Sequence, residues 1–317
     1  MENTNNNRAA KLELHFILND DTHFMDAFIK NKCEAELLAV AKELGNLLYL
    51  SLNFESEALA EGGLREFIKV AIKNSVVAAM FIDIFINVIS NILTTDPELI
   101  ALQKEEYRLH IAQLQQELKT SNRRLNNYSE QQLVESIIEN QKIRKRKSNF
   151  FQQAIKCKKL DAIAFGGVNS ENKPVEDPKT VKQADFPHYI LTSDDLEPVI
   201  DEDATIEIIA PVLKTQKYTW KGAYKGSVIS FVMSDLNFRA QVSAREISFI
   251  NGSSIDCVVK IFRKLDECGV EKITKYSVEN VNNIHDQRSS KVTPQGKAYK
   301  RRKKSSQGYV EQDLFDF

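Results

Sequence analysis

The chain has 317 residues, of which 42% are hydrophobic and 27% charged, and its formal net charge is −1. This composition is typical of globular proteins and leaves room for two domains that each bury a core. The cysteines are far apart and show no CxxC spacing, which argues against a disulfide framework or a redox motif. No apolar signal segment opens the chain, so we expect no Sec-type export and a cytoplasmic location, with inner-membrane association as the alternative.

The first seventy residues are predicted to form a short disordered lead (1–10) and a small α+β head (11–70). Apolar residues alternate along 11–18, fall at helical spacing between 24 and 48, and alternate again along 50–54. These patterns predict strand, helix and strand. The Gly-rich turn AEGGL (60–64) is then expected to lead into a second helix through Phe67 and Val70.

The most apolar stretch, VVAAMFIDIFINVISNIL (76–93), lies in a predicted helix over 72–94. This helix is long enough to cross a hydrocarbon core of about 30 Å. Polar side chains fall on one of its faces at helical spacing, namely Asp83, Asn87, Ser90, Asn91 and Thr94. An aspartate at the centre of a span costs about 2.5–3.5 kcal/mol, which makes an isolated span marginal. Three interpretations remain: a membrane-associated helix, a buried helix of a soluble core, or a contact between subunits.

A helical stalk is expected over 97–147, because apolar residues occupy heptad positions from Ile100 to Tyr128. Lys104 and Ser121 weaken this pattern. The heptads predict a parallel coiled coil and a homo-oligomer held through residues 76–128. The alternative is a long helix that folds back on its own chain.

The second half of the chain is predicted to be a β domain with flexible flanks. Residues 148–184 are expected to be a connector and a polar, proline-containing linker. Six short runs rich in Val, Ile, Phe and Tyr within 185–286, one of them over 238–250, predict a small antiparallel β-barrel or sandwich. Residues 287–317 are expected to be a disordered tail, so the fold class is α+β multidomain.

Two basic blocks are separated by an acidic run at 194–203. The first block ends the stalk and contains Lys142, Arg144, Lys145, Arg146 and Lys147. The second lies in the tail and contains Lys300, Arg301, Arg302, Lys303 and Lys304. Such segregation predicts a polyanionic partner, which could be DNA, RNA or anionic lipid. Mutual masking of the acidic and basic runs, or plain solvation, are the alternatives.

Sequence patterns typical of catalysis or metal binding are absent. The five histidines are scattered, and the chain has no HExxH and no GxSxG. The segment NDDTHFMD (19–26) could hold a divalent ion, but it lies at a strand-to-helix turn where Asp and Thr are expected as helix caps. AEGGL lacks the Lys–Ser/Thr of a phosphate-binding loop. We therefore predict a non-enzymatic protein without a cofactor, with an enzyme of unrecognised site as the remaining alternative.

The sole tryptophan, Trp220, lies among the aromatic and basic residues Lys217, Tyr218, Lys221, Tyr224 and Lys225. Such residues on a small barrel can stack bases and track phosphates. However, alternation along 217–225 places the aromatic residues on one face and the lysines on the other. This separation favours a Trp220 that fills the barrel.

The C-terminal sequence YVEQDLFDF (309–317) resembles the bacterial sliding-clamp-binding peptides. Asp313, Leu314 and Phe315 match the acidic–Leu–Phe end of that pattern. Either Glu311 stands where the pattern has Gln, or Gln312 serves as its glutamine with the spacer one residue short. The resemblance implies a sliding clamp as partner, with Leu314 and Phe315 as apolar anchors. The alternative is an acidic tail that folds back on the basic blocks. The head (DAFIKNKCEAELLAVAKEL, then EGGLREF), with its apolar segment and coiled coil, also resembles uncharacterised bacterial proteins.

Two functions of different classes follow from these features. The first is a non-enzymatic, oligomeric adaptor that acts near nucleic acid and could dock to a sliding clamp. The second is a membrane-associated effector of bacterial antiviral defence, in which the polar-striped helices bundle within the bilayer.

Overall fold

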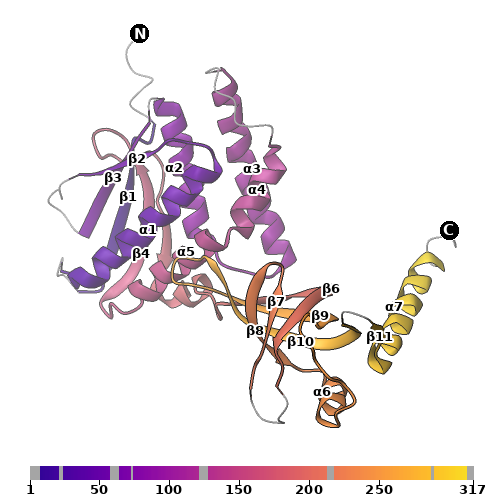
Figure 1. Cartoon of the computed structure of the whole chain (residues 1–317). Helices are drawn as coiled ribbons and strands as arrows, with labels where there is room; N and C mark the ends of the chain where they lie inside the picture. The colour runs from indigo at the N-terminus through magenta and orange to yellow at the C-terminus, as the bar shows by residue number, and fades with distance from the viewer. Residues whose placement is uncertain are drawn as a thin grey trace. The chain divides into compact units, whose positions relative to one another are not determined.

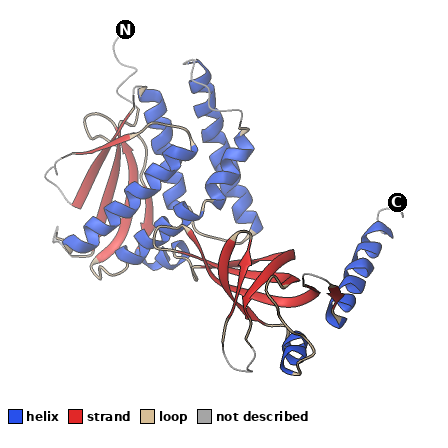
Figure 2. Ribbon diagram, in the orientation of Figure 1, coloured by secondary structure: helices blue, strands red, loops and turns tan. Residues whose placement is uncertain are grey.

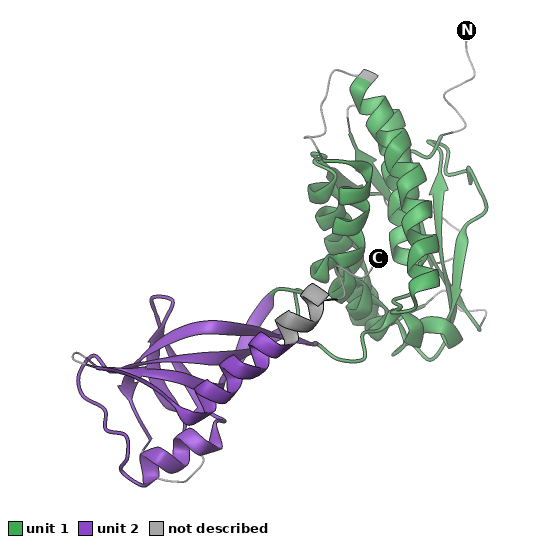
Figure 3. Cartoon of the chain, turned by 90° about the vertical axis from the view of Figure 1, so that its right-hand side faces the viewer, with its two compact units in different colours: residues 1–194, 266–270 green, residues 195–265, 271–317 purple. Residues whose placement is uncertain are grey.

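The computed structural model describes residues 8–20, 24–57, 64–72, 74–120, 128–212, 218–286 and 289–312. The chain divides into two compact units (Figure 3). Unit 1 comprises residues 1–194 and 266–270, and unit 2 comprises residues 195–265 and 271–317.

A five-stranded antiparallel sheet forms the base of unit 1, in the order β2-β3-β1-β4-β5. Its strands are β1 (Lys11–Leu18), β2 (Asn53–Ser56), β3 (Leu64–Ala71), β4 (Leu160–Val168) and β5 (Lys179–Lys182). The central strand β1 pairs with β3 on one side and with β4 on the other, so Leu14 lies opposite both Glu66 and Phe165. The predicted strand at 11–18 is therefore found, whereas residues 64–71 form β3 and not the expected helix.

Helices pack with this sheet around one apolar core (Figure 2). They are α1 (Ala27–Leu47), α2 (Ser75–Ser90), α3 (Pro97–Thr120), α4 (Glu130–Glu139), α5 (Gln141–Ala154) and the short 3₁₀ helix η1 (Gln183–Tyr189). The apolar segment forms α2, whose residues Phe81, Ile82, Ile84 and Ile89 are at most 1% exposed. Across the described ranges, no helix combines the length and the apolarity required to cross a membrane.

The expected stalk is folded back on its own chain within unit 1. Tyr107, Ile111, Leu114 and Leu118 of the predicted heptad face are buried in the core of the same chain. Helix α3 packs against α2 and α4. This is the alternative to a coiled coil that the sequence left open.

The segment predicted as a connector and linker (148–184) is an integral part of unit 1. It supplies the end of α5 together with β4, β5 and η1. Because β1 pairs with β4 along its length, the 11–70 head has no complete sheet without the segment that follows the stalk.

Unit 2 is a closed five-stranded barrel (Figure 1). Its strands are β6 (Asp195–Ala210), β7 (Trp220–Tyr224), β8 (Ser227–Met233), β9 (Ser254–Leu265) and β10 (Glu271–His285). The order β10-β8-β7-β6-β9 closes through an additional β9–β10 pairing. In chain order the strands of the closed barrel run 1-2-3-5-4, and a helix, α6 (Leu236–Ser243), lies between the third and fourth strands.

The predicted barrel is thus confirmed, with two corrections to its details. The pairing of β8 with β10 is parallel, with Phe231 opposite Tyr276, so the barrel is not wholly antiparallel. The run at 238–250, expected to be a strand, forms most of α6 and a following loop. Phe238 on α6 packs beside Trp220 and closes the barrel interior.

Much of the expected disordered tail has regular structure in unit 2. Strand β11 (Ser290–Val292) pairs with β10, and helix α7 (Pro294–Gln312) follows it (Figure 1). The fold is therefore mixed α+β, with a sheet in one unit and a closed barrel in the other.

Candidate functional site

Helix α7 is anchored to the barrel at its first turn. The buried Thr293 donates its hydroxyl to the carbonyl of Val281 on β10. The same hydroxyl accepts the N–H of Gly296 at 2.9 Å, as expected of a helix cap. Gly296 lies against the backbone of Asn282, and a Cβ atom there would overlap the Asn282 carbonyl oxygen. The barrel therefore fixes the start of α7.

One face of α7 continues this contact with the barrel. Gly296, Tyr299 and Lys303 are spaced by three and four residues and so share a face. The Nζ of Lys303 lies 2.6 Å from a carboxylate oxygen of Glu202 on β6. The hydrogen bond to this carboxylate raises the pKa of Lys303, and Lys303 in turn lowers the pKa of Glu202. Lys303, one of the predicted polyanion-binding residues, is thus turned toward the barrel.

Another face of α7 is basic and exposed. We call Lys297, Lys300, Arg301 and Lys304 the basic stripe, because they fall at i, i+3, i+4 and i+7 and all four are exposed. Arg302 is exposed as well. Three members of the stripe belong to the predicted block, and Lys297 was missed because it precedes the continuous basic run. The structure thus presents part of the second basic block as an ordered surface.

A hydrogen-bonded network holds the barrel beside the start of α7. The Asp256 carboxylate on β9 accepts hydrogen bonds from Thr205 (2.9 Å) and Asn283 (2.9 Å), and pairs with His285 at 2.6 Å. Burial opposes ionisation, but these hydrogen bonds outweigh it and lower the pKa of Asp256. Lys300 donates in turn to Asn283 at 3.4 Å. The network therefore connects three strands and reaches the basic stripe.

The barrel surface carries one aromatic ring between two cations. Phe262 on β9 lies opposite Lys275 on β10 and is partly exposed. The Nζ atoms of Lys260 and Lys275 lie 5.4 and 5.1 Å from its ring centroid. Both ammonium groups lie over the ring, so positive charge gathers around a partly exposed aromatic side chain, and a base that stacks on Phe262 would displace them toward its phosphates.

Trp220 is 2% exposed and packs among Phe231, Phe238 and Phe249, which confirms that it fills the barrel. Tyr224 is 5% exposed and lies in the same core, as the alternation predicted, whereas Tyr218 is 61% exposed and does not share the face of Trp220. Lys221 is exposed. Lys225 pairs with Asp201 at 2.8 Å. Lys217 lies outside the described residues.

The first basic block has partners within unit 1. Lys142 pairs with Glu43 at 3.5 Å, Lys145 with Asp194 at 2.6 Å, and Arg146 with Glu36 at 3.0 Å. Lys147 is buried, and it donates to the carbonyls of Val88 (2.8 Å) and Asn91 at the end of α2. Arg144 lines a cavity. Most of the basic side chains of this block are therefore paired or buried within unit 1.

Three residues of the polar stripe of α2 have hydrogen-bond partners within unit 1, and two line cavities. Asn87 accepts a hydrogen bond from Lys179, and Ser90 donates to the carbonyl of Ile86 at 2.6 Å. Asn91 donates to Glu106 at 2.9 Å and to the Tyr107 hydroxyl at 3.2 Å. Asp83 lines a second cavity with His110, and burial raises the pKa of its carboxyl. Thr94 lines the same cavity as Arg144.

Other predicted sites are placed only in part. Asp26 caps α1 by accepting the N–H groups of Phe28 (2.8 Å) and Ile29 (3.0 Å), as the capping interpretation of 19–26 predicted. His23 lies outside the described residues, among which no cluster of metal-binding side chains is found. Gln312 is the last residue of α7, and Asp313, Leu314 and Phe315 lie outside the described part of the chain.

Comparison with protein-family models, with curated proteins and with solved structures found no match for this chain.

Proposed function

We propose that the chain is a non-enzymatic nucleic-acid-binding adaptor, in which the barrel and the basic stripe of α7 hold a single strand. The observation that carries the proposal is the basic stripe itself. Four exposed cations stand on one face of a helix that is anchored to the barrel through Gly296 and Lys303 on another face. A fixed row of cations can contact successive phosphates and release their counterions.

The barrel supports a single-stranded ligand. Its strand order is that of a barrel used for oligonucleotides, although fold alone does not establish function. The Lys260–Phe262–Lys275 arrangement supplies an aromatic face with flanking cations. Stacking on such a face tolerates every base, so we expect little sequence preference.

The first basic block contributes less to this function than its sequence suggests. Lys145 and Arg146 are committed to ion pairs, and Lys147 is buried. The membrane-effector alternative gains no support from α2, because Asn87, Ser90 and Asn91 of its stripe have hydrogen-bond partners within unit 1. Bundling of α2 helices in a bilayer would require unit 1 to open.

The experiment compares the basic stripe with an equal loss of charge elsewhere. The variant Lys297→Gln, Lys300→Gln, Arg301→Gln, Lys304→Gln is titrated with fluorescent dT20, a 20-nucleotide RNA and a 20-base-pair duplex. The matched control replaces four exposed lysines of unit 1, Lys32, Lys42, Lys156 and Lys158, by Gln.

We expect the stripe variant to bind dT20 or the RNA at least tenfold more weakly than the intact protein, while the control stays within twofold. Equal losses of affinity in both variants would show that the effect comes from net charge alone and not from the basic stripe. Absence of binding by the intact protein at low salt would refute the proposed function.

A sliding clamp as docking partner and a homo-oligomer are further parts of this proposal. The C-terminal residues Gln312 to Phe315 begin eight residues after Lys304, the last residue of the basic stripe. An adaptor of this kind would bring a clamp and a nucleic-acid strand to the same end of the chain.

A further inference from the structure

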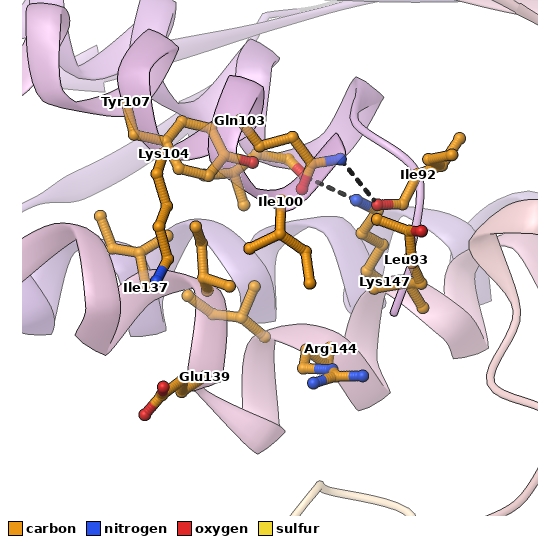
Figure 4. Close-up of a pocket in the computed structure, with 14 residues that line it drawn as sticks. Ile92, Leu93, Ile100, Gln103, Lys104, Tyr107, Ile137, Glu139, Arg144 and Lys147 are labelled. Carbon is orange, nitrogen blue, oxygen red and sulfur yellow. Dashed lines mark hydrogen bonds between the residues drawn. The ribbon is translucent and has the colours of Figure 1, made fainter. Parts of the chain in front are cut away.

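Unit 1 contains a cavity of about 320 Å³ whose lining is unlike that of an ordinary packing defect. It lies between the end of α2 and helices α3, α4 and α5 (Figure 4). Its volume falls in the range of small-molecule sites, about 300–1,000 Å³.

Half of the residues that line the cavity are aliphatic. They are Val88, Ile92, Leu93, Ile100, Ile137, Ile138 and Ile143. This part of the lining disfavours a strongly hydrated ligand body. It favours a ligand whose body is hydrocarbon.

Three cations also line the cavity: Lys104, Arg144 and Lys147. Lys147 is 3% exposed, and its contacts with the carbonyls of Val88 and Asn91 hold it at the end of α2. Figure 4 shows its ammonium group on the Ile92 side of the cavity, whereas Lys104 extends toward Ile137. One carboxylate, that of the exposed Glu139, lies on the lining as well.

Arg144 stands out among these cations. Its Nε atom is buried and has no hydrogen-bond partner. Within the described residues, neither Arg144 nor Lys104 forms an ion pair or a side-chain hydrogen bond. A buried guanidinium donor without a partner costs free energy, and a shift of the Arg144 side chain toward a bound anion would give this donor an acceptor. A carboxylate or phosphate oxygen is the acceptor that a guanidinium binds best.

We propose that this cavity binds a small amphipathic anion, with its hydrocarbon body against the isoleucines and its carboxylate or phosphate group on Arg144. Lys104 adds positive potential to the same space, and Lys147 adds to it when it is protonated. The site lies in unit 1 and does not depend on the nucleic-acid function proposed for unit 2.

The test uses octanoate, octyl phosphate and the neutral octanol as probes, titrated into the full chain and followed by ligand-observed NMR. We expect at least one of the two anions to bind tenfold or more tightly than octanol. Which anion binds more tightly distinguishes a carboxylate site from a phosphate site. Equal binding of the anions and octanol, or no binding of any probe, would overturn the proposal.

Variants then locate the site. Arg144→Gln is expected to weaken binding of the tighter-binding anion at least tenfold, and Lys104→Gln at least fivefold. Neither variant should change the binding of octanol much. Lys142→Gln, on the same helix but paired with Glu43, is the matched control and should leave binding unchanged. Ile100→Trp fills the cavity without touching a cation and should abolish binding while circular dichroism reports a folded chain. Binding that survives both Arg144→Gln and Ile100→Trp would place the probe elsewhere and refute the site.

Discussion

Gly296 of α7 lies so close to Asn282 of β10 that a Cβ atom at position 296 would overlap the Asn282 carbonyl oxygen. This close approach lets Thr293 cap α7 and brings Lys303 within 2.6 Å of Glu202. The orientation of the basic stripe therefore depends on a glycine that carries no charge.

Replacing Gly296 by Val is expected to displace α7 from the barrel. The collision costs about 1–3 kcal/mol if α7 stays in place, so the helix should shift or detach. We predict a several-fold loss of dT20 affinity although every basic residue is still present. Fluorescence anisotropy measures the affinity. Ser290→Val, at an exposed position of β11, is the control and should leave the affinity unchanged.

Lys147 is expected to make stability depend on pH. Burial lowers the pKa of its ammonium group to about 7, well below the usual value for lysine. Between pH 7 and 10 the unfolded chain therefore binds more protons than the folded chain at this residue, and the free energy of unfolding should rise with pH. Urea unfolding of the intact protein and of Lys147→Met at several pH values measures this. The rise should be smaller in the variant, and identical pH profiles would contradict the assignment.

An oligomer held through residues 76–128 must use surface that unit 1 leaves uncovered. Leu99, Leu102 and Leu109 of α3 are 38%, 68% and 59% exposed. We predict that light scattering at micromolar concentration reports an oligomer, and that Leu102→Glu with Leu109→Glu shifts it to monomer. Leu114→Glu cannot serve as a test variant for the oligomer, because Leu114 is buried in the core of unit 1. A monomeric intact protein would contradict the prediction.

The clamp interaction is expected to depend on two apolar anchors. Burial of Leu314 and Phe315 in a groove would contribute about 1.5–3 kcal/mol each. Replacing both by Ala should abolish binding to a purified bacterial sliding clamp at any salt concentration. Neutralising the basic residues at 300–304 should weaken binding mainly at low salt. Surface plasmon resonance at several salt concentrations distinguishes the two effects. Unaltered clamp binding after the double alanine replacement would show that the tail is not the docking segment.

Local patterns predicted several elements of this fold correctly. Alternation along 11–18 gives β1, and helical spacing between 24 and 48 gives α1. The alternation around Trp220 placed its ring inside the barrel, where it packs on Phe231. In each case the signal lies within one element and reflects one buried face.

Features that depend on pairing between distant parts of the chain could not be predicted from local patterns. Strand β4 pairs with β1, which lies about 150 residues earlier in the chain. The polar segment 169–182 is therefore interpreted as a linker from its sequence alone, because nothing in that sequence shows that it continues this sheet. The run at 64–71 carries buried Phe67 and Val70 at a spacing that fits a helix, yet pairing with β1 makes it a strand. Likewise, the ion pairs of Lys145 and Arg146 and the cavity at Arg144 arise only when α5 meets other elements.

The dependence of dT20 affinity on salt tests the proposed function most directly. For every phosphate that the protein no longer neutralises, the slope of log Kd against log salt concentration should fall by about 0.7 for a single strand. By the same rule, we predict that the quadruple glutamine variant of the basic stripe has a slope about 2–3 smaller than that of the intact protein. The control, with four lysines of unit 1 replaced, should keep the slope of the intact protein. Equal slopes for the intact protein and the stripe variant would show that α7 does not contact the strand, and would contradict the account.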